Sequence, residues 1–254
     1  MTMIGYTYAA PKTAGEALAL LRKNDAQAIV SLQHIAEFKT IKMDDAGCVI
    51  GSRVTLSELK QHSASANYPA LTQALASISD PHLLNHTTME DSLNASDIEL
   101  SSVTAALLAM DADVVIVGDE MEEKYAFSDF LQTDLTHDEL VAFVRIVLPD
   151  ESTSSYENAG FLSGSKPICG VAVARQKNAD NTLRIVLGGC TDKPVRLQSV
   201  EAALAGKELN ASTVDAALEK IEGEPLTLRK DLPIGEDYLR HLIKALTKKA
   251  ILKL

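Results

Sequence analysis

The sequence predicts an α+β fold in two regions, residues 1–150 and 151–254. Helical and strand patterns follow one another in mixed order along the chain. With 254 residues, 46% of them hydrophobic, the chain is long enough for one large or two modest domains with a real core. The polar stretch 150–158 (DESTSSYEN) separates two groups of these patterns, and we predict that it is the linker between the regions.

The first region begins with a helical pattern. Apolar residues recur at helical spacing in residues 14–23, and Arg22 and Lys23 close the segment, which predicts a helix. Thr55 and Glu58 have the spacing of a capping box, so a second helix is expected to start there. The other predicted elements are strands at 28–32, 47–51, 112–117 and 140–148 and helices at 70–78 and 102–110.

The second region begins with two strands. Residues 168–174 and 183–187 are apolar runs separated by the polar segment 177–181 (KNADN), a pattern typical of a hairpin. Helices are then expected at 198–205, 212–221 and 235–252.

Composition excludes several classes of protein. The formal net charge is −11, whereas nucleic-acid binding requires a basic surface. No apolar run is long enough for a membrane span, and the N-terminus lacks the segments of a signal peptide. Cys48, Cys169 and Cys190 are isolated and form no C-x-x-C pair, which argues against disulfides and against an iron–sulfur cluster in this chain. Such cysteines fit a reducing cytoplasm.

Charge is distributed unevenly along the chain. Residues 90–150 hold fifteen Asp and Glu against Lys124 and Arg145, while residues 226–254 hold seven Lys and Arg against three acids. One interpretation is a solvated acidic face and a basic terminal helix. The other is a docking surface for a partner protein, in which such charges would steer association.

Few groups of residues suggest a chemical site. His82, His86 and Glu90 have the spacing that zinc ligands on one helix face would need. Because Pro81 precedes them and polar residues interrupt the pattern, we predict a polar loop and no metal site. The sequence has no G-x-S-x-G, P-loop or H-E-x-x-H motif, so no catalytic residue is assigned. Cys190 is either a reactive thiol or a side chain packed at the end of a strand.

Several short motifs occur in an order that carries more information than any one of them. In the C-terminal third these are RIVLGG at 184–189, KPVR at 193–196, EAALAG at 201–206 and DYLRHL at 237–242. Upstream they are Y-x-x-P at 8–11, VIGSRVTL at 49–56 and LLAMDA at 107–112. In this order they resemble the flavin-domain, or medium, subunit of the xanthine dehydrogenase and carbon monoxide dehydrogenase family of molybdenum hydroxylases, from about Tyr6 to Ile251.

The resemblance implies a fold and a role. Residues 1–150 would be an FAD-domain-like region of two small α/β subdomains, and residues 151–254 would be the family's C-terminal domain, with a three-stranded sheet and helices. In this family the medium subunit binds FAD and relays electrons from the iron–sulfur clusters of a small subunit to an acceptor. The molybdopterin cofactor belongs to a large subunit. The resemblance therefore implies a cytoplasmic oxidoreductase subunit with an iron–sulfur small subunit and a molybdopterin large subunit as partners.

The glycine loops that hold FAD in this family are missing here. The family loops resemble A-G-G-T-D-L and R-N-x-G-T-x-G-G-N, in which glycine lets the backbone approach the phosphates and turn its N–H groups toward them. Residues 16–46 contain no glycine. The first loop is therefore expected to be deleted, so that the helix at 14–23 leads almost directly into Ile29 to Gln33.

The second loop survives in outline at residues 84–92 (LNHTTMEDS). Asn85 and Thr88 match the family pattern and Ser92 stands at its last Asn, so these three are the candidate remnants of a cofactor site. Glu90 and Asp91 replace the glycine pair. A carboxylate about 4 Å from a phosphate would add about 4 kcal/mol of repulsion at an intermediate dielectric constant. FAD binding is therefore expected to be weak or lost, and independent activity is not expected.

Three functions remain open at this point. The chain is a flavoprotein-like medium subunit that relays electrons if FAD is bound, a cofactor-free structural subunit of such a complex, or a stand-alone protein that uses the fold to bind another small ligand.

Overall fold

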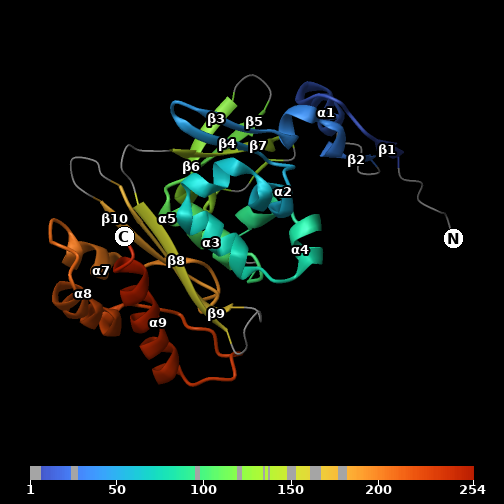
Figure 1. Cartoon of the computed structure of the whole chain (residues 1–254). Helices are drawn as coiled ribbons and strands as arrows, with labels where there is room; N and C mark the ends of the chain where they lie inside the picture. Colours follow the sequence, from blue (N-terminus) through green and yellow to red (C-terminus); the bar gives the residue numbers. More distant parts are fainter. Residues whose placement is uncertain are drawn as a thin grey trace.

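The computed structural model describes residues 7–23, 28–94, 98–118, 122–133, 135–136, 138–147, 153–160, 167–176 and 182–254. Strands in these residues form sheets of two, five and four strands. In Figure 1 the four-stranded sheet crosses the middle of the molecule, between helices of the N-terminal half and the C-terminal helices. The predicted α+β class is confirmed. No helix in the described part of the chain combines the length and hydropathy that crossing a bilayer requires.

A small β-α-β unit opens the chain. Strands β1 (Thr7–Ala9) and β2 (Ala28–Val30) pair in parallel, and helix α1 (Ala14–Arg22) lies between them in sequence. The Thr13 side chain caps α1 by accepting a hydrogen bond from the Glu16 N–H. The predicted helix at 14–23 is confirmed. The predicted strand at 28–32 ends early, because the chain turns into the 3₁₀ helices η1 (Leu32–His34) and η2 (Ala36–Lys39).

A five-stranded antiparallel sheet forms the centre of the N-terminal half. Its strands lie in the order β3 (Ile41–Asp44), β4 (Gly47–Gly51), β7 (Leu140–Val147), β5 (Asp113–Val117) and β6 (Glu122–Ala126). A Cβ on Gly51 would lie 2.2 Å from the Phe38 carbonyl oxygen, so only glycine allows this close approach. The strands predicted at 47–51, 112–117 and 140–148 are confirmed.

Further helical elements complete the N-terminal half, with those at residues 69–77 and 101–109 packed against the C-terminal sheet. They are α2 (Leu56–Gln61), η3 (Ser63–Asn67), α3 (Pro69–Ser77), α4 (Pro81–His86), η4 (Asp91–Leu93), α5 (Ser101–Ala109) and α6 (Phe127–Phe130). The capping box predicted at Thr55 and Glu58 is present at the start of α2. Every residue of α5 is buried, which explains why its sequence contains no charged residue and has no polar face.

The C-terminal half is built on a four-stranded antiparallel sheet. Its strands lie in the order β11 (Val195–Arg196), β10 (Leu183–Gly188), β9 (Pro167–Arg175) and β8 (Thr153–Gly160). The helical elements that follow the strands are α7 (Gln198–Leu204), α8 (Ala211–Leu218), η5 (Glu219–Gly223) and α9 (Glu236–Ile251). All the strands and helices predicted here are confirmed, while the predicted turn at 177–181 lies outside the described residues.

Strand β8 overturns two predictions. Residues 153–158 were expected in a linker, yet they are an edge strand, and the sheet has four described strands rather than three. The strand is polar but half-buried because distant segments satisfy its polar groups. The Ser155 hydroxyl donates to the Ala250 carbonyl (2.7 Å), and the Tyr156 N–H donates to the Gln73 side chain (2.6 Å). The division into residues 1–150 and 151–254 itself stays a prediction.

The four-stranded sheet is covered on both faces. Helix α9 packs on one face and α3 and α5 pack on the other, so the two halves of the chain share buried side chains. Gly188 allows α5 to come this close. A Cβ at that position would lie 2.7 Å from the Ser101 carbonyl oxygen and 3.2 Å from the Ala105 Cβ.

We predict that Gly188→Ala lowers the free energy of unfolding by about 1–3 kcal/mol, because the added methyl group would push a backbone carbonyl of α5 away from the sheet. Urea unfolding followed by circular dichroism measures the loss. Gly223→Ala is the matched control, since a Cβ there would meet nothing within 4 Å. Equal stability of the two variants would contradict the close contact between α5 and β10.

Glu157 joins β8 to the end of α9. Its side chain is only 8% exposed and forms ion pairs with Lys249 (2.6 Å) and Lys253. Burial raises the pKa of Glu157, but hydrogen bonds and charge from the two lysines lower it more, so the net shift is below the ordinary value of 4.5. The ion pairs therefore stabilise the fold above about pH 4.5, and this contribution is lost as the pH falls through the lowered pKa.

Glu157→Gln is therefore predicted to lower the free energy of unfolding by about 1–3 kcal/mol at pH 7, and by progressively less as the solution is acidified below pH 4.5. Urea titrations across the pH range measure the difference from the parent chain. Asp215→Asn breaks an exposed pair with Lys248 and serves as the control, for which a small effect is expected. A difference that did not depend on pH would rule out the ionised carboxylate as its source.

Candidate functional site

The segment that resembles the second cofactor loop is paired with a neighbouring stretch of backbone. Residues 87–90 run antiparallel to residues 52–56, with a β-bridge between Thr55 and Thr88. Three backbone hydrogen bonds hold them together: Leu56 N–H to Thr87 O (3.0 Å), Met89 N–H to Val54 O (2.8 Å) and Glu90 N–H to Ser52 O (3.0 Å). Residues 87–90 are thus held in an extended, paired conformation and do not form an open backbone turn.

Hydrogen bonds between Thr88 and Asp91 hold the loop closed. One Asp91 oxygen, Oδ2, accepts hydrogen bonds from the Thr88 N–H (2.7 Å) and from the Thr88 hydroxyl (2.8 Å). The Asp91 N–H in turn lies 3.4 Å from the Thr88 hydroxyl oxygen. This reciprocal arrangement has the spacing of a capping box and lies directly before the 3₁₀ helix η4, whose own N-cap residue, Glu90, forms no side-chain capping bond.

The three candidate remnants of the site do not converge. Asn85 is exposed on α4, whereas Thr88 is buried and engaged with Asp91. Ser92 is completely buried, and its hydroxyl donates to the Met89 carbonyl (2.6 Å). No common ligand could contact these side chains as they stand.

The backbone donors of the loop are also engaged. The N–H groups of Thr88, Met89, Glu90 and Asp91 donate within the segment or to residues 52–56. A phosphate loop binds through N–H groups that point at the ligand. In this chain those groups are directed inward.

Glu90 is held by Arg53, a partner that sequence reasoning missed. Arg53 Nη1 donates to a Glu90 carboxylate oxygen at 3.1 Å, across 37 residues of sequence. The two side chains are 23% and 31% exposed. Burial raises the pKa of Glu90, although Arg53 opposes that shift. No spacing signal could have predicted this pair, because strand pairing brings its members together.

The first family loop has no counterpart in the described residues near β2. Only Ser31 separates Val30, the last residue of β2, from the first residue of η1. The Ser31 N–H donates to the Ala9 carbonyl (2.8 Å), so β1 takes up this donor as well. Residues 24–27 lie outside the described part of the chain. Neither segment offers the glycine backbone and free N–H groups that the pyrophosphate of FAD would need, so the residues present do not fit that group.

The histidine pair does not form a metal site with Glu90. His82 and His86 lie on α4, so the prediction that this segment is a loop was wrong. Pro81 occupies the first turn of the helix, where proline is favoured, and Asp80 caps it. The two imidazole rings lie edge to face with centroids 4.4 Å apart, while Glu90 is paired with Arg53. No group of three potential ligands occurs among the described residues.

The cysteines are packed rather than reactive. Cys48, Cys169 and Cys190 are all buried. Burial and, to a lesser extent, Asp44 raise the pKa of Cys48 to about 11. A hydrogen bond with Cys190 and burial raise the pKa of Cys169. Thiols with raised pKa values are poor nucleophiles. Cys190 is completely buried, which supports its interpretation as a side chain packed at the end of a strand.

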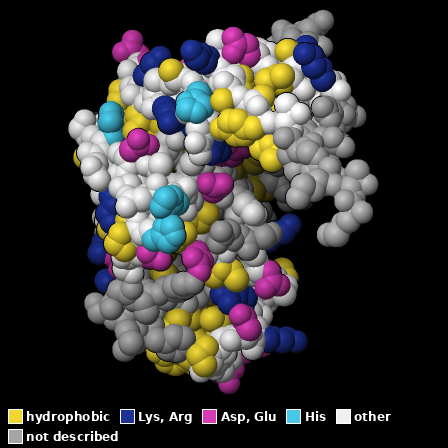
Figure 2. Space-filling model, turned by 90° about the vertical axis from the view of Figure 1, so that its right-hand side faces the viewer, with side chains coloured by type: hydrophobic (Ala, Val, Ile, Leu, Met, Phe, Trp, Pro, Cys, Tyr) yellow, Lys and Arg dark blue, Asp and Glu magenta, His cyan; other side chains and the backbone are white. Residues whose placement is uncertain are grey.

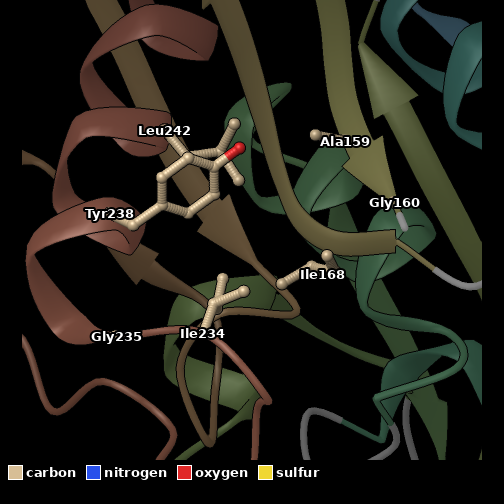
Figure 3. A pocket seen from close by; sticks show the side chains of 7 residues that line it. All are labelled: Ala159, Gly160, Ile168, Ile234, Gly235, Tyr238 and Leu242. Carbon is tan, nitrogen blue, oxygen red and sulfur yellow. The ribbon is translucent and has the colours of Figure 1, made fainter.

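A cavity of about 370 Å³ lies between α9 and the adjoining ends of β8 and β9. Figure 3 shows the Tyr238 ring of α9 facing Ile168 across this space, with Ile234 at its floor. Its lining consists of Ala159, Gly160, Ile168, Ile234, Gly235, Tyr238 and Leu242. The Tyr238 hydroxyl is the one polar side-chain group of these seven, so the described lining suits an apolar group and offers no carboxylate or imidazole.

The basic tail is neutralised within the C-terminal half. Six of its seven cations form ion pairs: Arg229 with Asp231, Arg240 with Glu236, Lys244 with Glu222, Lys248 with Asp215, and Lys249 and Lys253 with Glu157. Acidic and basic side chains are interspersed on the face drawn in Figure 2, which carries the N-terminal elements. These pairs favour the interpretation of the tail as a structural helix over that of a free basic docking surface.

Comparison with known proteins identifies relatives along the whole chain. A family model described as the FAD binding domain in molybdopterin dehydrogenase matches residues 13–150, and a model described as the CO dehydrogenase flavoprotein C-terminal domain matches residues 164–254. The glyceraldehyde dehydrogenase medium chain of Sulfolobus acidocaldarius is 23% identical, over 87% of this chain and 81% of that one. The carbon monoxide dehydrogenase medium chain of Hydrogenophaga pseudoflava is 23% identical, over 97% and 96%.

Solved structures show the same fold. Carbon monoxide dehydrogenase from Hydrogenophaga pseudoflava superposes with a TM-score of 0.83 at 22% identity, covering 99% of this chain and 98% of that one. Quinoline 2-oxidoreductase from Pseudomonas putida 86 gives a TM-score of 0.82 at 21% identity, covering 100% and 98%. This chain therefore has the same overall fold as these proteins.

The hydrogen bonds that Asp91 accepts from Thr88 lead to a prediction about stability. Asp91→Ala removes the acceptor for the Thr88 N–H and hydroxyl and should lower the free energy of unfolding by about 1–2 kcal/mol. Urea unfolding measures the loss. Asp45→Ala is the control, because Asp45 is exposed in the turn between β3 and β4. If both substitutions were neutral, the loop would not depend on its internal carboxylate.

Proposed function

The chain belongs to the family of FAD-binding, or medium, subunits of molybdopterin dehydrogenases, and from this membership we propose that it is a medium-type subunit that has lost tight FAD binding. The observation that carries the proposal is the closed loop at residues 87–92, whose backbone donors and side chains bind one another. Backbone donors that are already engaged in this way support a weak interaction with the phosphates of FAD.

The expected binding free energies support weak FAD binding rather than a modest loss of affinity. A nanomolar cofactor needs about 12 kcal/mol of binding free energy. Each charge-assisted hydrogen bond to a phosphate contributes about 1.5–3 kcal/mol, and two missing loops remove several of them. Opening the loop would also break its internal hydrogen bonds. Together these terms move the expected affinity toward the millimolar range.

The partners proposed for the chain are an iron–sulfur small subunit and a molybdopterin large subunit. The relatives named as medium chains support this, because a medium chain is one component of a larger assembly. Without FAD the role of the chain would be structural, holding its partners together. We also propose residues 1–150 and 151–254 as its two domains, joined through the shared packing of α3 and α5 on the C-terminal sheet.

A second candidate function rests on the cavity beside Tyr238. Its size lies within the range of small-molecule sites, so a stand-alone role in binding an apolar ligand is the alternative. A colourless chain that co-purifies with iron–sulfur and molybdopterin subunits favours the structural role. A colourless monomer that binds apolar dyes favours the alternative.

The chain purified alone is predicted to contain no stoichiometric FAD and to bind added FAD only weakly. Titration with flavin, followed by fluorescence quenching, is the measurement. Submicromolar binding to the parent chain would overturn the proposed loss.

A matched set of variants tests the reason for the loss. Glu90→Gly with Asp91→Gly should remove repulsion but restore little affinity, because the first loop is still absent. An A-G-G-T-D-L insert between Ala28 and Ser31, combined with the two glycines, should improve binding more than either change alone.

A further inference from the structure

We propose that the Glu90 carboxylate is a built-in anion that fills a latent oxyanion site on Arg53. A small external oxyanion, carboxylate or phosphate, would occupy the site once Glu90 is removed. This inference deepens the proposed loss of FAD binding and rests on it.

The backbone positions the site independently of the ion pair. The Arg53 N–H donates to the Phe38 carbonyl (2.8 Å), and the Ser52 N–H donates to the Ala142 carbonyl (2.8 Å). The Glu90 N–H donates to the Ser52 carbonyl (3.0 Å). Because these bonds involve no side chain of the pair, the backbone at Arg53 should keep its place when the carboxylate is removed.

Arg53 has unused capacity to bind an anion. A guanidinium carries five N–H donors in a planar fork that matches carboxylate and phosphate oxygens. Only its Nη1 bond to Glu90 is formed with a side chain, while Nε is buried and has no hydrogen-bond partner among the described residues. A bidentate oxyanion that reached Nε as well as Nη1 would satisfy more of this fork than the single contact with Glu90 does.

The size of the site follows from the group that fills it. Glu90 contributes one carboxylate, and the Arg53 side chain is 23% exposed even with this carboxylate in place. Space of that kind suits formate, acetate or inorganic phosphate. It does not suit a dinucleotide, whose second phosphate would meet the Asp91 carboxylate and the engaged N–H groups of the loop.

Chemical rescue tests the proposal. The melting temperatures of the parent chain and of Glu90→Ala are compared in sodium formate, in sodium phosphate and in sodium chloride of equal ionic strength. Glu90→Ala should be stabilised by formate or phosphate by about 2–4 °C more than the parent chain is, the shift expected for one charged contact in a protein of this size. The formate and phosphate arms show which oxyanion the site prefers.

Two controls keep the result specific to Arg53. The double variant Arg53→Met/Glu90→Ala should lose the extra stabilisation. Asp113→Ala frees Lys124, whose side chain is 61% exposed, and should show no anion-specific rescue. Equal shifts in the parent chain and in Glu90→Ala, or an undiminished shift in the double variant, would overturn the proposal. If Glu90→Ala does not fold in chloride, its refolding yields in formate and in chloride are compared. A higher yield in formate supports the site, and equal yields overturn it.

The outcome is separable from the proposed function. Submicromolar FAD binding to the parent chain would overturn the proposed loss of the cofactor whatever the rescue shows. Failure of rescue alone would remove the latent site and leave the loss of FAD binding standing.

Discussion

The packing of α5 is the constraint on which most of this structure depends. The helix has no solvent-facing side, lies against β9 and β10 of the C-terminal sheet, and contacts α3 beside it. Its Thr104 hydroxyl also donates to the Ser92 carbonyl (2.8 Å), which ties the closed loop to the core. Moving α5 would therefore disturb the C-terminal sheet and the loop at residues 87–92 together. Glycine at position 188 is needed because the helix approaches the strand so closely.

The sequence predicted features that depend on residues close together in the chain, and it missed those that depend on residues far apart. The capping box at Thr55 and the amphipathic α9 depend on residues a few positions apart, so their patterns were readable. Strand β8 is polar, and its burial depends on Gln73 and Ala250, more than eighty residues away. The Arg53–Glu90 pair depends on the pairing of residues 52–56 with residues 87–90. Interactions of this kind leave no period or spacing in the sequence.

Fold and cofactor site draw on different sources of free energy, which explains how one could persist without the other. The fold rests on buried side chains in three clusters, and none of these requires a ligand. A phosphate site rests on a few backbone N–H groups held open toward solvent, usually by glycine. Replacing those glycines costs little packing energy as long as the freed donors find other acceptors. In this chain Asp91 and the carbonyls of residues 52–54 provide them.

A comparison of free-energy costs also explains why Glu90 occupies the loop at residues 87–92. Arg53 is partly buried, and a buried guanidinium without a counter-ion is strongly destabilising, so a chain that has lost its anionic ligand gains by providing an anion of its own. Glu90 meets that need at a cost, since burial raises its pKa and thus disfavours its charged form. An unpaired Arg53 would cost more, because its charge cannot be relieved by losing a proton at neutral pH. Under the proposed loss of FAD, the ion pair is therefore better understood as compensation for the missing anion than as a source of stability in its own right.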